Sequence, residues 1–189
     1  FVYIIAFLIT FVATTALTIG GTGAALVLIP MFDWLGVPLR EAMATALLLN
    51  VFAMGVASIT FIKKRLVVFK LAVPMLIMGS IMSPLGAKTN QFLPIPILKW
   101  FFVAFLILAS ARVLYFGKSA KMDISQTSFK KLIAWGCAFG AFAGFIGGLI
   151  GVGGGNIIVP ILIGVGFDPK KASATTSFIV IFTSFFGFL

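Results

Sequence analysis

Long apolar runs separated by short polar stretches make up most of the chain. A helix that crosses a bilayer needs about 20 apolar residues at a rise of 1.5 Å per residue. Runs of about this length are Phe1–Ile19, Ala42–Ile62, Leu71–Ala87, Ile97–Phe116, Leu132–Ile150 and Ala172–Leu189. The pattern predicts an all-α integral membrane protein, a polytopic helical bundle. The third run is shorter and contains Pro74 and Pro84, so we expect it to form a kinked helix.

Two further apolar runs, Ala24–Leu35 and Asn156–Phe167, are too short to span a bilayer in the same way. As helices they would be about 18 Å long, roughly half of the apolar thickness of a membrane. Each follows a glycine-rich break and precedes a turn that contains glycine. Non-helical backbone at membrane depth is tolerated only where protein or a water-filled cavity satisfies it. We therefore look for function at these two half-helices.

The composition excludes several classes of protein. Hydrophobic residues make up 61% of the chain and charged residues only 10%, which excludes disordered chains and ordinary soluble enzymes. The single cysteine, Cys137, excludes a disulfide scaffold. There is no histidine, and the four acidic residues all lie in predicted loops: Asp33, Glu41, Asp123 and Asp168. We therefore predict no metal site, no cofactor and no enzymatic activity.

The net charge of +10 comes largely from two basic stretches between apolar runs. One lies at residues 63–70 and the other at residues 112–131. Short basic loops that flank apolar spans are typical of the cytoplasmic side of a membrane protein. We therefore expect the lipid bilayer, not nucleic acid, as the partner of this charge. Residues 88–96 would then face outward.

The chain contains an internal repeat with an offset of 130 residues. Without a gap, the shift superposes Gly21 on Gly151, Gly23 on Gly153, Pro30 on Pro160, Gly36 on Gly166, and Thr45 on Thr175. The pattern predicts a first transmembrane repeat at residues 1–117, a cytoplasmic basic linker at 118–131 and an incomplete second repeat at 132–189. By the same offset about sixty residues would be missing from the second copy, for an intact length of about 250.

The helix before each break carries small residues at every fourth position. In the second copy these are Gly136, Gly140, Gly144 and Gly148, and in the first Ala6, Thr10, Thr14 and Thr18. Such stripes let membrane helices approach closely, so we expect the two copies to pack small face against small face. If the half-helices cross the membrane, each unit has five passages and the repeats are inverted. If they only dip in, the repeats are parallel.

The two breaks are the candidate anion site. A helix that starts after a glycine-rich break presents free backbone N–H groups and the positive end of its dipole, and such ends bind anions. The candidate residues at the breaks are Gly21, Thr22, Gly23, Gly153, Gly154, Gly155 and Asn156. Further candidates are the polar residues at the start of the following helices: Thr45, Asn50, Thr175, Thr176 and Ser177. The alternative is close packing at glycine, with the hydroxyls bonded to their own helix.

These features favour a transporter for a small anion, bound near mid-membrane between the repeats. No carboxylate or histidine lies within a span, so a proton relay lacks its usual carriers. Uniport, coupling through a further segment and a selective anion channel all stay open. An intramembrane enzyme would need catalytic groups that the spans do not contain. A structural or assembly partner of another membrane complex, without solute flux, is the main alternative.

The sequence resembles the sulfite exporter TauE/SafE family, also called the TSUP family of anion permeases. The resemblance rests on GVGGGNIIVP at residues 151–160 and ASATTS at 172–177. The weaker first copy has GGTGAALVLIP at 20–30 and AMATA at 42–46. The resemblance implies a multi-pass permease of the prokaryotic plasma membrane, with about eight helices built by duplication. It also implies sulfite, organosulfonates or related anions as substrates, moved by export or uniport.

The first copy departs from the richer motif of the second. Ala24, Ala25 and Leu26 stand where the second copy has Gly154, Gly155 and Asn156. If both copies bind the anion, we expect the second to contribute more of the site. The sequence does not indicate the oligomeric state.

Overall fold

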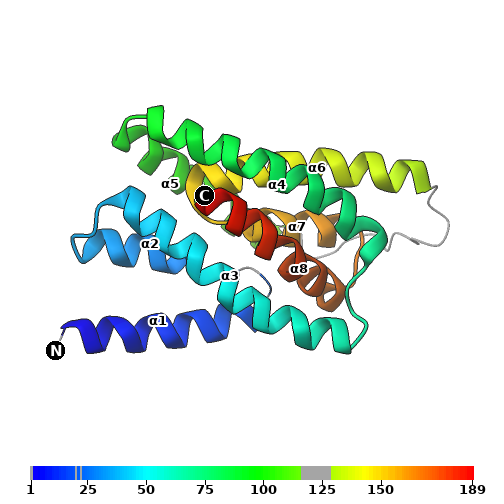
Figure 1. Ribbon diagram of the computed structural model, residues 1–189, viewed down its shortest axis with the longest axis horizontal. Helices are drawn as coiled ribbons and strands as arrows, with labels where there is room; N and C mark the ends of the chain where they lie inside the picture. The colour runs from blue at the N-terminus through cyan, green and yellow to red at the C-terminus, as the bar shows by residue number, and fades with distance from the viewer. Residues whose placement is uncertain (1, 20, 22, 116–128) are drawn as a thin grey trace.

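A computed structural model describes residues 2–19, 21, 23–115 and 129–189. The predicted linker at 118–131 falls mostly outside the described residues. The elements found are α1 (Val2–Ile19), α2 (Ala25–Trp34), α3 (Leu39–Lys63), α4 (Phe69–Phe92), α5 (Ile95–Tyr115), α6 (Phe129–Ile150), α7 (Gly155–Gly164) and α8 (Pro169–Phe188). Every regular element in the described part of the chain is a helix, as the apolar pattern predicts (Figure 1).

The two half-helices are present and are shorter than predicted. Both α2 and α7 have 10 residues. Helix α7 begins at Gly155, one residue before the predicted start, and each half-helix ends in a turn that contains a glycine, Gly36 or Gly166. Both glycines have a positive φ, 85° and 99°, which L-residues with a side chain rarely adopt. The glycines thus end the half-helices and allow the chain to turn back.

Helix α4 corrects the prediction of a short helix that ends at Ala87. It has 24 residues and continues through Pro74 and Pro84 to Phe92. Its polar last turn is held by side-chain hydrogen bonds, from Asn90 Nδ2 to the carbonyl oxygen of Leu149 at 2.6 Å and from Thr89 Oγ1 to that of Leu85. The prediction placed the helix end at the first polar residues, but these residues have partners and extend it.

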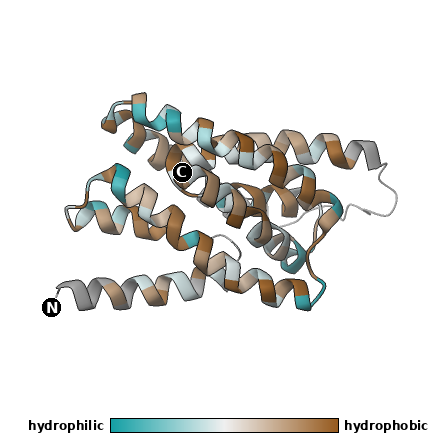
Figure 2. Ribbon diagram, in the orientation of Figure 1, coloured by the Kyte–Doolittle hydropathy of each residue, from teal (hydrophilic) through white to brown (hydrophobic). Residues whose placement is uncertain are grey.

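Within the described residues, four helical stretches are long and apolar enough to cross a membrane: α3, α4, Leu132–Ile150 of α6, and α8. Figure 2 shows hydrophobic residues along these helices and hydrophilic residues mainly at the ends of the bundle. Large side chains on the outer faces, such as Phe52 and Ile59, are exposed, which suits contact with lipid tails. The protein is therefore a multi-pass membrane protein.

Corresponding helices of the two halves run in opposite directions. Helix α1 runs from left to right in Figure 1 and α6 from right to left, and the same holds for α3 and α8. Gly187, near the end of α8, lies against Leu47, near the start of α3, as expected for an antiparallel pair. Opposite directions are typical of inverted-topology repeats.

The glycine stripe of α6 packs against α4, which corrects the expectation that it packs on the small face of α1. The backbone of Gly140 lies against Met75, and that of Gly144 against Gly79. Gly148 continues the row against Ser83. Helix α4 has its own small residues at the same four-residue spacing, so the two backbones can approach closely. The two helices run parallel to each other.

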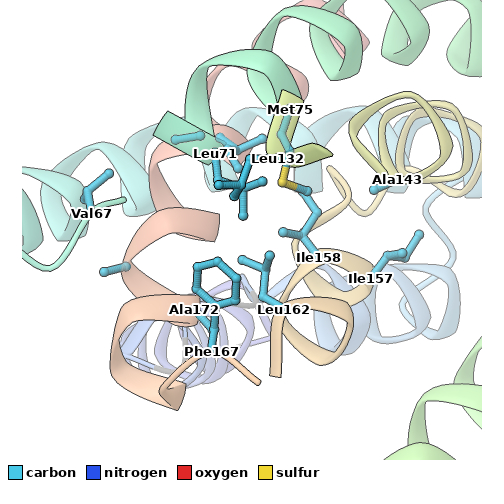
Figure 3. Close-up of a cluster of buried hydrophobic side chains, with 13 residues drawn as sticks. Val67, Leu71, Met75, Leu132, Ala143, Ile157, Ile158, Leu162, Phe167 and Ala172 are labelled. Atoms are coloured by element: carbon cyan, nitrogen blue, oxygen red, sulfur yellow. The ribbon is translucent and has the colours of Figure 1, made fainter. Parts of the chain in front are cut away.

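Apolar side chains from both halves fill the space between these helices. One cluster combines Val67, which precedes α4, and Leu71 and Met75 of α4 with Ile158 and Leu162 of α7 (Figure 3). A second cluster lies around α2 and the start of α3 and includes Leu28, Ile29 and Met43. Each half-helix is therefore packed within protein, as non-spanning backbone in a membrane must be.

Candidate functional site

The glycine breaks before α2 and α7 have the same backbone conformation. Gly21 and Gly151 have φ angles of 74° and 75°, and Gly23 and Gly153 have φ angles of 78° and 74°. A residue with Cβ is strained at such angles by about 1–2 kcal/mol, which explains why glycine occupies all four positions. Gly154 adds a further positive φ of 80° in the second break. Thr22 lies outside the described residues.

The first turns of the two half-helices are also alike. The N–H groups of Val27 and Leu28 donate to the carbonyl oxygen of Ala24, and those of Ile157 and Ile158 donate to that of Gly154. Ala24 and Gly154 are the N-cap residues, and no side chain caps either helix. Each half-helix thus begins without a side-chain partner for its first N–H groups, at the positive end of its dipole.

Each break packs against the long helix of the other half. Gly21 lies against Ser173 in α8, and Gly151 lies against Met43 in α3. Both pairs are related by the offset of 130 residues, so the two contacts are reciprocal. A reciprocal contact of this kind is what a two-fold relation between two units produces. The two contacts bring the starts of both half-helices to the place where α3 and α8 lie across each other, called the crossing below.

Asn50 of α3 lies at this crossing and touches both breaks. Its side chain is 1% exposed, and its Nδ2 donates to the carbonyl oxygen of Val152 over 3.2 Å. On the other side, a Cβ placed on Gly23 would lie 2.6 Å from Asn50 Oδ1, so Gly23 leaves room for the amide. Oδ1 has no hydrogen-bond partner among the described residues. An unpaired buried amide oxygen is costly, and because it is an acceptor it calls for a donor such as a water molecule.

Two residues of α8, Thr183 and Ser184, complete the crossing. The Thr183 hydroxyl donates to the carbonyl oxygen of Gly153 over 2.7 Å, and its own carbonyl oxygen accepts from Ser83 Oγ of α4 over 2.6 Å. Ser184 Oγ lies against Gly153, and no partner for it is found in the described part of the chain. Sequence reasoning missed both residues. The signal available was their spacing, because they follow Thr176 by seven and eight residues and share its helix face.

The hydroxyls predicted at the start of α8 have mixed surroundings, and all three are buried. Thr175 Oγ1 accepts a hydrogen bond of 3.1 Å from the N–H of Val68, so this hydroxyl joins α8 to the start of α4. Ser177 Oγ donates back to the carbonyl oxygen of Ser173 in its own helix. Thr176 Oγ1 is unpaired among the described residues. Thr45 of the first copy is exposed on α3 and does not join the crossing.

Asn156 lies on the other side of the second break, where α7 begins. Its side chain is 7% exposed, and Nδ2 has no hydrogen-bond partner within the described residues. It lines a cavity of about 410 Å³ between α5, α6 and α7 whose other lining residues are apolar, among them Phe105, Phe142 and Ile146. The glycine break therefore has a buried amide on each side, Asn50 and Asn156.

The acidic groups that the structure describes lie away from the crossing. Asp33 Oδ2 pairs with Lys99 Nζ at 2.7 Å, and Asp168 caps α8 by accepting from the N–H of Lys170 at 2.9 Å. Glu41 is exposed near the start of α3. A ligand at the crossing would meet glycine backbone, amides and hydroxyls. Neutral donors of this kind bind a small anion through hydrogen bonds and helix dipoles.

The glycine-rich breaks and the helices after them lie within a family match. The sequence profile described as "Sulfite exporter TauE/SafE" matches residues 6–189, nearly the whole chain. The chain belongs to this family. Transport across membranes, not an enzymatic reaction, is what the family's name describes.

Individual relatives of this TauE/SafE protein support the assignment. "Probable membrane transporter protein YunE" of Bacillus subtilis (strain 168) is 26% identical, over 98% of this chain and 76% of its own length. "Probable membrane transporter protein MJ0441" of Methanocaldococcus jannaschii is 31% identical, over 90% of this chain and 63% of its own. "Sulfite exporter TauE/SafE family protein 3" of Arabidopsis thaliana is 46% identical over 48 residues.

The matches thus cover 76% and 63% of the length of these two prokaryotic relatives. No solved structure matches it.

Proposed function

We propose that this TauE/SafE protein is a permease for a small anion, such as sulfite, an organosulfonate or a related organic anion. The observation that carries the proposal is the convergence of both half-helix starts on Asn50. An anion there would meet two helix N-termini beside the Asn50 amide group, whose Nδ2 also donates to the carbonyl oxygen of Val152. Two positive dipole ends favour an anion without any fixed positive charge, which also allows its release.

The second break would form the larger part of the site. It offers the glycine stretch Gly153–Gly155, with the hydroxyl of Ser184 beside it and the amide of Asn156 after it. The first break offers Gly21 and Gly23, and Ala24 replaces the third glycine. The second break therefore allows closer approach to the backbone.

The mechanism that fits this arrangement is alternating access between two inverted units, with the anion near mid-membrane. We place the protein in the plasma membrane of a prokaryotic-type cell, where it would act as an exporter or uniporter. The basic turn after α3 and the start of α6 lie at the same end of the bundle, which would be the cytoplasmic end (Figure 1).

Efflux from liposomes tests the proposal. The full-length protein would be reconstituted into vesicles loaded with sulfite, and efflux followed with and without a pH gradient and an imposed membrane potential. We expect efflux that follows the potential. Efflux that requires a proton gradient would support transport and reject uniport. Absence of flux for sulfite and for a panel of sulfonates would reject the permease and favour an assembly partner.

The variant Gly154→Val tests whether transport depends on the second break. Valine at a φ of 80° is strained, and its Cβ would lie 2.8 Å from the carbonyl oxygen of Ala143, so the backbone of the break must shift. We expect folded protein in the membrane with transport lowered at least tenfold. The matched control is Gly55→Val, because a Cβ on Gly55 meets nothing within 4 Å. Unchanged transport in Gly154→Val would reject the site.

A further inference from the structure

A groove runs along the bundle between α1 and α3. Its volume is about 600 Å³. Helix α1 lies at the opposite edge of the bundle from α4 and α6 (Figure 1). Residues of α1 and α3 line it in nearly equal share: Phe11, Thr14, Thr15, Thr18, Ala53, Val56, Ala57, Thr60, Phe61 and Lys64. Small and hydroxyl residues dominate the floor of the groove, which is the surface that closely packed membrane helices use.

The equivalent surface of the other half is covered by α4. Shifted by 130 positions, four groove residues fall on residues of α6 and α8 that contact α4. The pairs are Thr14 with Gly144, Thr18 with Gly148, Ala53 with Thr183, and Ala57 with Gly187. In the covered half, Gly144 lies against Gly79, while Gly148, Gly187 and Thr183 all lie against Ser83. The groove is therefore the equivalent of the surface on which α4 packs.

Hydroxyl side chains line the groove as they line the covered interface. Thr15 and Thr60 are exposed on the two helices that form it. On the covered side, the Ser83 hydroxyl of α4 crosses the interface to the carbonyl oxygen of Thr183 at 2.6 Å. A helix seated in the groove would bring a polar contact of the same kind.

A basic side chain caps the end of α4, and its equivalent in the other half is exposed. Arg40 donates to the carbonyl oxygens of Gln91 and Leu93, over 3.1 and 2.9 Å, and so caps the C-terminal end of α4. Lys170 is its equivalent under the offset, and it is exposed at the start of α8. Gly21, just after α1, lies near this point because it contacts Ser173.

We propose that the groove is the seat of a membrane helix equivalent to α4, contributed by a further segment of the full-length protein. The relatives are longer than this chain, since the match covers 63% of the Methanocaldococcus jannaschii protein. The helix would carry small residues at every fourth position toward α1 and α3. Thr14 and Thr18 of α1 stand where α6 has Gly144 and Gly148. Because threonine is larger than glycine, this helix lies farther from α1 than α4 lies from α6. The inference is independent of the transported substrate.

Lipid accessibility at Ala57 tests the proposal. The full-length protein with Cys137→Ala would carry a single new cysteine, Ala57→Cys in the groove or Phe52→Cys on the outer face of α3 as the control. Each would receive a nitroxide label in lipid nanodiscs that hold one copy of the protein. Power-saturation EPR then measures collision with oxygen, which concentrates among the lipid tails. We expect several-fold lower oxygen accessibility at position 57 than at position 52.

Equal accessibility at the two positions would overturn the proposal, because the groove would then face lipid. Protection at position 57 that appears only when each disc holds two copies would also overturn it, since a second protein would be the occupant. A second variant, Ala57→Leu, guards against effects of the label. We expect it to lower the unfolding temperature of the full-length protein, while Phe52→Leu leaves it unchanged. No difference between these two variants would count against a seated helix.

Discussion

Asn50 in α3 donates a hydrogen bond of 3.2 Å to the carbonyl oxygen of Val152 in the second glycine break. The bond joins residues 102 positions apart and connects the two halves at their crossing. Both partners are almost fully buried, so the bond forms where water does not compete with it. It fixes the loop of one half to the long helix of the other.

Replacing Asn50 by leucine should therefore impair both stability and transport. Leucine keeps much of the volume but leaves the carbonyl oxygen of Val152 unpaired, at a cost of about 1–3 kcal/mol. We expect sulfite efflux to fall at least tenfold and the unfolding temperature to decrease. The control is Thr45→Ala, at an exposed position that does not join the crossing. Equal efflux from the two variants would show that Asn50 has no part in the site.

Thr183→Val tests the second bond at the break. Valine has nearly the shape of threonine but cannot donate to the carbonyl oxygen of Gly153, which the hydroxyl reaches over 2.7 Å. We expect a loss of about 1–2 kcal/mol in stability and slower transport. Thr183→Ser should restore most of the transport, because it restores the donor. If valine and serine behave alike in the efflux assay, the hydroxyl does not support the break.

Gly144→Leu should disrupt the packing of α6 on α4. A Cβ at position 144 would run into the backbone of Gly79, so the helices must separate. Overpacking of this kind costs typically about 1–3 kcal/mol, and we expect less folded protein in the membrane. Ala138→Leu is the control, because residue 138 is exposed on the same helix. Fluorescence-detected gel filtration would compare the yields, and equal yields would contradict the packing described.

Arg40→Ala should loosen the end of α4. The guanidinium contacts the last carbonyl groups of the helix, where a cation also interacts favourably with the dipole, in total about 1 kcal/mol. We expect a decrease in unfolding temperature, and a smaller one for Arg40→Lys, which keeps the charge but not the planar fork. A lysine variant as unstable as the alanine variant would show that geometry, not charge, matters here.

The sequence alone predicted the parts of this fold that depend on apolar length and on glycine. The half-helices were predictable because an apolar run of twelve residues cannot span a membrane, and Gly21 and Gly151 marked the breaks before them. Asn50 was predictable as a costly polar residue within a span. The family was also visible in the glycine motif.

Contacts between helices were harder to predict. The stripe of Gly140 and Gly144 indicates close packing, but several helices carry small residues, and nothing in the spacing selects α4 over α1. The end of α4 was misplaced because the partner of Asn90 lies in α6, 59 positions away. Thr183 and Ser184 were missed because a hydroxyl in a membrane helix usually bonds its own backbone, and only the fold shows that Thr183 reaches Gly153.

The packing of α4 has a consequence for how such a protein could have arisen. Helix α4 belongs by sequence to the first half, yet its partners are α6 and α8 of the second. A gene that encoded only one half would leave this helix without a surface to pack on. If the two halves are inverted copies of one unit, a protein made of a single half would need a second copy in the opposite orientation, each supplying one helix to the other.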